Sequence, residues 1–330
     1  MAIAPELADW LLDSDPTLRW QVERDLLHLP EDTWRATRAR VPAEGFGRRL
    51  LERQDPEGTW ARGAHFPGKG WRAAGVAIGE TGEDAQPWVS TDWSLRALQD
   101  WGVDAAALGD TAERIAANCR WEYDGLPYWG GETDVCINAM TLASGAWLGA
   151  DVAALAAWFP EHQLSDGGWN CEWVEGSRRS SFHSTLNALR GLLDYERITG
   201  DASVRAARRR GEEYLLARRL LYRLSSGEQV ARWATRFSHP FRWRYSALSA
   251  ADHFRAAGRH DGTDPDPRLA DAMDAIRAAR EPDGRWRQGG REPGLVWFET
   301  DVPPDEPSKW LTLVGTRVLE WWDGTGAERT

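Results

Sequence analysis

Three side chains of the kinds that bind zinc stand in front of long apolar stretches of the chain. Asp134 and Cys136 are two residues apart, and His183 follows 47 residues after Cys136. Zinc accepts carboxylate, thiolate and imidazole ligands, and three protein ligands leave one tetrahedral position for water or substrate. The sequence therefore predicts an open, catalytic type of zinc site on Asp134, Cys136 and His183.

Each of these residues also has an ordinary structural interpretation. Asp134 and Asp92 could be helix N-caps, a common use of Asp. Cys136 could be a small buried hydrophobe, and His183 could be a satisfied core residue. Their common register on successive predicted helices favours the metal site. Cys171 could approach the same place as a fourth ligand.

Tryptophan-containing corners repeat along the chain, which has 21 Trp in 330 residues. The pattern Q-x3-G-x-W occurs at 54–60 and 163–169, with Arg for Gln at 280–286 and a degenerate copy at 122–129. Gly supplies a positive φ that ends a helix, and we expect the Trp to plug the corner against the next repeat. Such internal repeats indicate a repeat architecture.

Two kinds of helix alternate between these corners. Stretches that are apolar on most faces predict five buried inner helices: 93–101, 136–149, 184–195, 244–254 and 311–322. Residues 18–27 look like an imperfect sixth inner helix. More charged, amphipathic stretches predict outer helices: 106–118, 151–163, 202–219 and 266–280. No segment alternates apolar and polar residues over a usable length, so no strand is expected.

This alternation predicts an all-α fold, an (α/α)6 toroid of inner and outer helices in one domain over 1–330. An open α-solenoid is the alternative. Residues 1–43 would supply the helices that complete the ring. The connections 61–89, 222–240 and 287–307 are long, and long loops in compact domains are often functional. We expect them at one mouth, with 287–307 over the cavity.

In a ring, the starts of the inner helices converge on one mouth of a central cavity, the usual setting of a binding site. Counting back from the small residue of each inner helix selects polar and aromatic side chains at these starts. The catalytic candidates are Asp92, His239, Arg242 and Arg244. The substrate-binding candidates are Trp93, Phe182, Arg236, Trp243, Lys309 and Trp310. Glu299 and Asp301 are weaker candidates for a general base, and the remaining histidines are expected in loops or on outer faces.

Composition excludes several classes of protein. The net charge is −11 and the pI is near 5.2, which argues against non-specific nucleic-acid binding. No apolar run is long enough for a membrane span, and the acidic N-terminus lacks the features of an export signal. Three Cys form no paired framework. We therefore expect a cytoplasmic protein, monomer or homodimer, that acts on a small molecule.

The metal motif resembles that of a known family. Asp134-Val-Cys136, followed by INAMTLASGAWLG, resembles the D-x-C helix of protein prenyltransferase β subunits. Phe182-His183-Ser184, followed by TLNALRGL, looks like the helix that carries their third zinc ligand. The Trp corners are similar to those of the wider superfamily, which includes squalene–hopene cyclases. The resemblance spans about residues 44–325 and implies an (α/α)6 toroid, zinc on Asp134, Cys136 and His183, and thiolate alkylation.

The chain departs from that family at several positions. The segment 128–133 lacks the cations that hold a prenyl diphosphate, Ile137 stands where Tyr is usual, and Phe182 replaces the Tyr before the His. Nothing in the sequence points to a prenyltransferase α-type subunit. The acid motif D-x-D-D of the cyclases is absent from the sequence as well. These departures indicate a single-chain relative whose substrate has diverged.

Three functions are compatible with the sequence. The first is a zinc enzyme that activates a thiol or water for transfer to, or hydrolysis of, a small and partly apolar substrate. The second is a metal-free cyclase or isomerase, with Asp92 or Asp134 as the acid and Trp faces stabilising a carbocation. The third is a binding protein without catalysis on the same fold. Metal content distinguishes the first two, and a cavity plugged by Trp would favour the third.

Overall fold

The structure is a computed structural model that describes residues 3–73, 76–77 and 86–324. The described chain is mostly helical, as the sequence predicts. Its helices are α1 (Pro5–Leu12), α2 (Pro16–Asp25), α3 (Glu31–Arg40), α4 (Gly45–Leu51), α5 (Thr91–Asp100), α6 (Thr111–Asn118), α7 (Val135–Leu148), α8 (Ala153–Glu161), α9 (Phe182–Thr199), α10 (Arg205–Ala217), α11 (Ala247–Asp261), α12 (Ala270–Ala278) and α13 (Lys309–Gly324). No described helix is both long and apolar enough to cross a bilayer.

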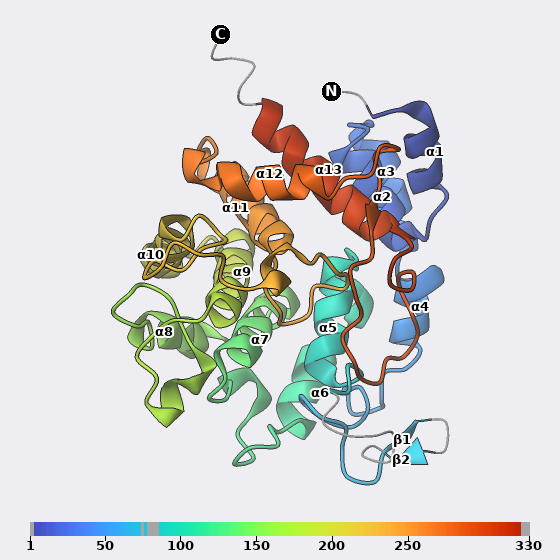
Figure 1. Ribbon diagram of the computed structural model, residues 1–330. Coiled ribbons are helices and arrows are strands. Elements are labelled where there is room, and N and C mark those ends of the chain that lie inside the picture. The colour runs from blue at the N-terminus through green and yellow to red at the C-terminus, as the bar shows by residue number, and fades with distance from the viewer. Residues whose placement is uncertain (1–2, 74–75, 78–85, 325–330) are drawn as a thin grey trace.

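Four strands of two residues each accompany the helices, a feature that the sequence did not predict. β1 (Arg72–Ala73) pairs with β2 (Val76–Ala77), and β3 (Trp286–Arg287) pairs with β4 (Pro307–Ser308), both antiparallel. The second pair closes the base of the long connection 288–306. That connection runs in front of α5 (Figure 1), and its Leu295 carbonyl accepts a hydrogen bond from the backbone of Trp88 at 2.7 Å.

The predicted inner helices contact one another in sequence order. α5 packs against α7, α7 against α9, α9 against α11, and α11 against α13 (Figure 1). α13 then contacts α2. α2 in turn reaches the end of α5, because Trp20 Nε1 donates to the carbonyl of Trp101 at 2.8 Å. The series of contacts therefore returns to the helix from which it starts.

The Trp corners are built alike in three places. Trp60, Trp169 and Trp286 are each at most 1 % exposed. Each indole N–H donates to the carbonyl of the residue ten positions earlier in the chain, at 2.8–3.0 Å. Each Trp backbone N–H donates at 3.0 Å to a Thr hydroxyl near the start of an inner helix, which ties the corner to the next repeat: Thr91, Thr185 and Thr312.

One helix start differs from the prediction. α11 begins at Ala247 rather than near residue 244, and Ser246 caps it through a capping box with Ser249. The small and hydroxylic residues at 246–249 satisfy the first N–H groups of the helix, which Arg side chains cannot do because they carry no acceptor. Arg242 and Arg244 therefore lie in the connection before α11 and not on its first turn. The predicted loop 61–89 lies partly outside the described residues.

Candidate functional site

Asp134, Cys136 and Cys171 bring their ligand atoms together at the start of α7. One carboxylate oxygen and the two sulfur atoms all lie within 4.8 Å of one another. The sulfur atoms are 3.3 Å apart, and Cys171 Sγ lies 3.0 Å from Asp134 Oδ1. Asp134 is also the N-cap of α7, since its Oδ1 accepts from the Cys136 backbone N–H at 2.7 Å. The carboxylate thus fixes the helix start and the Cys136 side chain beside it.

Side chains of α9 hold both sulfur atoms. Ser184 Oγ accepts the Cys171 backbone N–H at 3.1 Å and lies 3.2 Å from Cys171 Sγ. Asn187 Nδ2 lies 3.5 Å from Cys136 Sγ and also donates to the His183 carbonyl at 2.9 Å. The hydrogen bond with Cys171, together with burial, raises the pKa of the Cys136 thiol well above its usual value. The thiol is therefore protonated at neutral pH in these surroundings.

His183 lies on the first turn of α9 but is not a member of this cluster. Its Nδ1 accepts a hydrogen bond from the backbone N–H of Tyr245 at 2.8 Å. Burial and the nearby Arg244 lower the pKa of His183 to about 4, so the ring is neutral at pH 7. A neutral imidazole that accepts at Nδ1 carries its proton on Nε2, which is then a donor. In this arrangement Cys171, rather than His183, completes the set with Asp134 and Cys136.

Asp92 pairs with a histidine that the sequence analysis left out. Its Oδ2 lies 2.5 Å from His65 Nδ1, and the carboxylate is buried. Burial opposes the charged imidazole, but Asp92 outweighs it and raises the pKa of His65. Glu122, in the connection after α6, accepts the backbone N–H groups of Ala64, His65 and Phe66 at 2.9–3.2 Å and so holds that loop in place. Asp92 is therefore an ion-pair partner and not the N-cap, which is Ser90.

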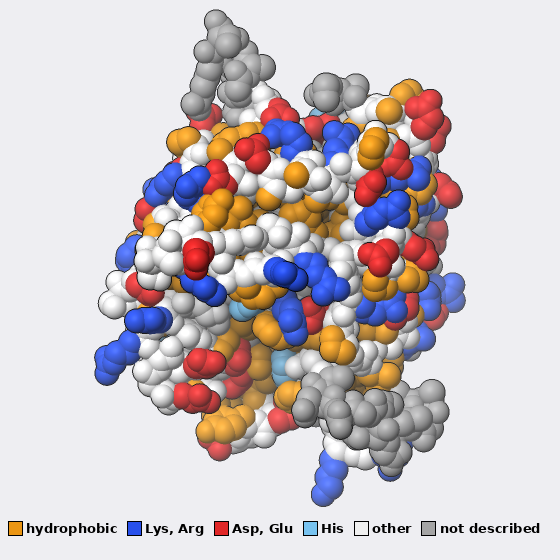
Figure 2. Space-filling view, in the orientation of Figure 1, with side chains coloured by type: hydrophobic (Ala, Val, Ile, Leu, Met, Phe, Trp, Pro, Cys, Tyr) orange, Lys and Arg blue, Asp and Glu red, His pale blue; other side chains and the backbone are white. Residues whose placement is uncertain are grey.

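A cavity lined by aromatic and charged side chains lies next to the thiol cluster, and Asn187, which contacts Cys136 Sγ, is one of its lining residues. Its volume is about 120 Å³. Figure 2 shows hydrophobic and His side chains in a hollow of this face, with both basic and acidic side chains at its edge. The lining side chains come from α4, α5, α7, α9, α13 and the connections before α5, α11 and α13, among them Trp88, Trp93, Arg96, Met140, Asn187, Arg190, His239, Arg242, Glu292, Trp297, Asp301 and Trp310.

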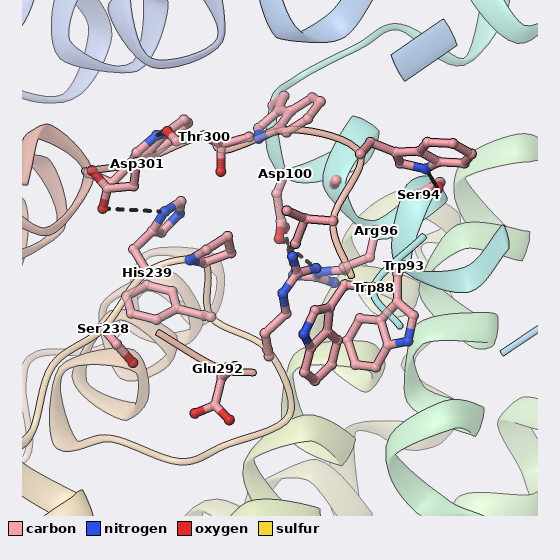
Figure 3. A pocket seen from close by; sticks show the side chains of 18 of the residues that line it. Trp88, Trp93, Ser94, Arg96, Asp100, Ser238, His239, Glu292, Thr300 and Asp301 are labelled. Carbon is pink, nitrogen blue, oxygen red and sulfur yellow. Dashed lines mark hydrogen bonds and ion pairs between the residues drawn. The ribbon is translucent and has the colours of Figure 1, made fainter. Parts of the chain in front are cut away.

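His239 and Asp301 face each other at one end of this cavity (Figure 3). His239 Nδ1 is 4.0 Å from Asp301 Oδ2 and has no hydrogen-bond partner among the described residues. The imidazole stacks on Trp310 with ring centroids 4.6 Å apart. Burial and then Arg242 lower the pKa of His239 to about 3, whereas burial raises the pKa of Asp301 to about 6. The pair therefore offers a neutral base beside a carboxyl group that titrates near neutral pH.

The structure distributes the other predicted site residues over several places. Trp93 and Trp310 line the cavity, as does Arg242. Trp243 and Phe182 do not line it: Trp243 packs on His183 and Phe182 on Tyr245. Outside the lining as well, Arg244 pairs with Glu292 at 2.6 Å, Arg236 donates to the Gly289 carbonyl, and Lys309 donates to the Asp13 carbonyl. These three cations are therefore committed to the protein itself.

A second group of possible metal ligands has a simpler role. Glu196, His260 and Asp261 gather at the far ends of α9 and α11. The fully buried Arg208 lies among them and donates to Glu196 at 2.9 Å and to Asp261 at 2.8 Å. A buried guanidinium needs such carboxylates around it. This group is therefore accounted for as the counter-charge of Arg208.

Comparison with known proteins finds similarity to a solved structure but to no family model or curated protein. No family model matches the sequence, and no curated protein matches it. A crystal structure of a protein from Actinoplanes is similar over 95 % of this chain and 90 % of its own length, with 16 % sequence identity and a TM-score of 0.45.

Proposed function

We propose that the helices form a single (α/α)6 toroid over the whole chain. The return of helix contacts from α13 to α2 and on to α5 supports a closed ring over an open solenoid. The three equivalent Trp corners support a repeated unit of one outer and one inner helix. The cavity then lies at the mouth where the inner helices start, covered by the connection 288–306.

We propose that the protein is a zinc-dependent enzyme acting on a small, partly apolar substrate. One observation carries this: two thiols and a carboxylate from different parts of the chain meet within 4.8 Å beside a Trp-lined cavity. A tetrahedral zinc needs ligand atoms about 3.5–3.8 Å apart. The separations of 3.3 Å and 3.0 Å are close to that and exceed the roughly 2.05 Å of a disulfide.

Asp134, Cys136 and Cys171 would hold the ion, with Ser184 and Asn187 orienting the two sulfur atoms. When bound, zinc supplies a lowered pKa for a thiol or water, which makes a nucleophile available at neutral pH. The protein contributes the cavity that excludes water from the substrate and the indole faces of Trp88 and Trp93 that orient it. The resulting chemistry is transfer to a thiol or hydrolysis of the bound substrate.

Zinc content of purified variants tests this proposal. The protein, purified under reducing conditions, should hold about one zinc per chain by elemental analysis. C136S and C171S should lose it, whereas C119S should keep it because Cys119 is a separate buried thiol. H183Q should also keep it. Loss in H183Q with retention in C171S would restore the ligand set of the prenyltransferase resemblance, and a zinc-free protein would refute the metal site.

A metal-free acid mechanism is the second candidate, and one observation favours it. Asp301 has a pKa near 6 in the cavity wall, a value suited to a general acid at neutral pH. The Trp faces around it could stabilise a cationic intermediate. This places the acid at Asp301 rather than at Asp92, which His65 already engages. Two results together would support the metal-free mechanism. The purified protein would contain no metal, and its conversion of a bound substrate would be lost in D301N and retained in C136S.

A further inference from the structure

Arg242 is the arginine of the cavity wall that forms no ion pair with any described residue. Its guanidinium lies over the ring of Trp88, 4.8 Å from the centroid, and 5.8 Å from that of Trp93. The two indoles meet edge to face at 4.7 Å and form one aromatic corner. Cation–π contacts stabilise such a guanidinium but leave its N–H groups unpaired. Those donors are therefore available to a ligand.

The other arginines of the cavity wall are already paired. Arg96 lies 2.8 Å from Asp100 and 3.0 Å from Asp194, and Arg190 lies 3.7 Å from Asp100. Arg291 pairs with Glu299 at 3.1 Å. Each of these three guanidinium groups has a carboxylate oxygen within 4.0 Å. The Arg242 guanidinium has none in the part of the chain that the structure describes.

The acids nearest Arg242 have partners elsewhere. Glu292 lies 2.6 Å from Arg244, and Glu299 pairs with Arg291. Burial lowers the pKa of Arg242 to about 10, against the pull of Glu299, Glu292 and Asp92, so the group remains a cation at neutral pH. A guanidinium with little water around it is stabilised by an anion that accepts hydrogen bonds from two of its parallel N–H groups.

We propose that this cavity binds a small organic monoanion, a carboxylate on a flat apolar body, with Arg242 on the carboxylate and Trp88 and Trp93 against the body. A carboxylate matches the two parallel N–H donors of a guanidinium. One uncommitted cation among acids suits a single negative charge rather than a diphosphate. The cavity volume of about 120 Å³ is of the same order as the roughly 150 Å³ of a cavity that binds benzene, which favours a body of no more than one ring.

This assignment is independent of the metal, because no member of the thiol cluster lines the cavity. The test uses the full chain as purified, with the zinc content of each sample measured alongside. Benzoate is the probe and benzamide is its neutral isostere, and binding of each is followed by ligand-observed NMR and calorimetry. Benzoate should bind at least tenfold more tightly than benzamide to the unmodified protein.

R242Q should weaken benzoate binding at least tenfold and leave benzamide binding unchanged, whereas R242K should lose less. R232Q is the matched control, since it removes the same charge from an exposed position of the same connection. Equal binding of benzoate and benzamide to the unmodified protein would overturn the proposal even if R242Q failed to fold. Tighter, Arg242-dependent binding of isopentenyl diphosphate would overturn the monoanion assignment. Unchanged zinc content in R242Q separates this result from the fate of the metal site.

Discussion

Asp301 is a carboxyl group that folding transfers from water into the wall of an aromatic cavity. Burial raises its pKa from 3.8 to about 6, although Ser308 donates a hydrogen bond to it at 2.6 Å. The folded state therefore holds a proton at pH 4–6 that the unfolded chain releases. By linkage, this group's contribution to stability is present below pH 4 and is lost as the pH rises through 6.

D301N should therefore be more stable than the unmodified protein at pH 7.5, by roughly 1–2 kcal/mol once partial exposure is discounted. The difference should vanish near pH 4.5, because the native carboxyl is then already neutral. Urea unfolding at the two pH values measures both quantities. D305N, on the exposed part of the same loop, serves as the control. A stability gain that is equal at both pH values would contradict the assignment.

The sequence predicted part of the site and missed the rest for identifiable reasons. Asp134 and Cys136 are near in sequence, so their approach at a helix start was predictable. His65 was missed because it lies in a Gly-rich loop without periodicity, whose position depends on Glu122, 57 residues further along the chain. The orientation of His183 depends on the backbone N–H of Tyr245, 62 residues further on. Contacts between residues so far apart in the chain produce no local pattern in the sequence.

At the scale of elements, the corners connect each helix pair to the next through one indole. Their positions were predicted by the Q-x3-G-x-W pattern, since each consensus residue makes a contact or a turn within the corner itself. Gln54 and Gln163 donate to the carbonyl four residues later, at 3.0 Å and 2.6 Å. The start of α11 was placed three residues too early, because the capping box of Ser246 and Ser249 sets the first residue of the helix at Ala247.

G315A should destabilise the protein, because α13 passes directly over the corner Trp286. A Cβ added at Gly315 would lie 2.7 Å from the indole ring, closer than real Cβ contacts occur. Overpacking of this kind costs about 1–3 kcal/mol. G324A at the other end of α13 meets nothing within 4 Å and is the control. Urea unfolding of both variants checks the prediction, and equal stabilities would show that the corner is loosely packed.

At the scale of the whole molecule, one arginine joins three inner helices. Arg317 of α13 lies 3.1 Å from Asp25 of α2 and 2.5 Å from Asp252 of α11. Burial alone would raise the pKa of Asp25, but Arg24 and Arg317 hold it at about 2. The stabilisation by this ionised pair is therefore present above pH 4 and is lost as the pH falls toward 2.

R317M should destabilise the protein by about 1.5–3 kcal/mol at pH 7, because two buried carboxylates lose their shared cation and keep only Arg24 and Arg255 as partners. The loss should shrink as the pH falls and those carboxylates take up protons. R259M, at an exposed position of α11, is the control. Unfolding free energies at pH 7 and at about pH 2.5 provide the comparison, because the carboxylates of the unmodified protein are still ionised at pH 4. A loss that is the same at both pH values would mean that Arg317 contributes mainly by packing.

The contact between α13 and α2 also determines how the molecule opens. In a linear array of repeats, the outermost units have one neighbour each, so amide hydrogens exchange first at the two ends. In the closed ring proposed above, the first and last inner helices of the described chain are neighbours of each other, so neither has the single neighbour of a terminal unit. Amides of α2 and α13 should consequently exchange as slowly as those of α7 and α9, in one concerted opening of the whole chain.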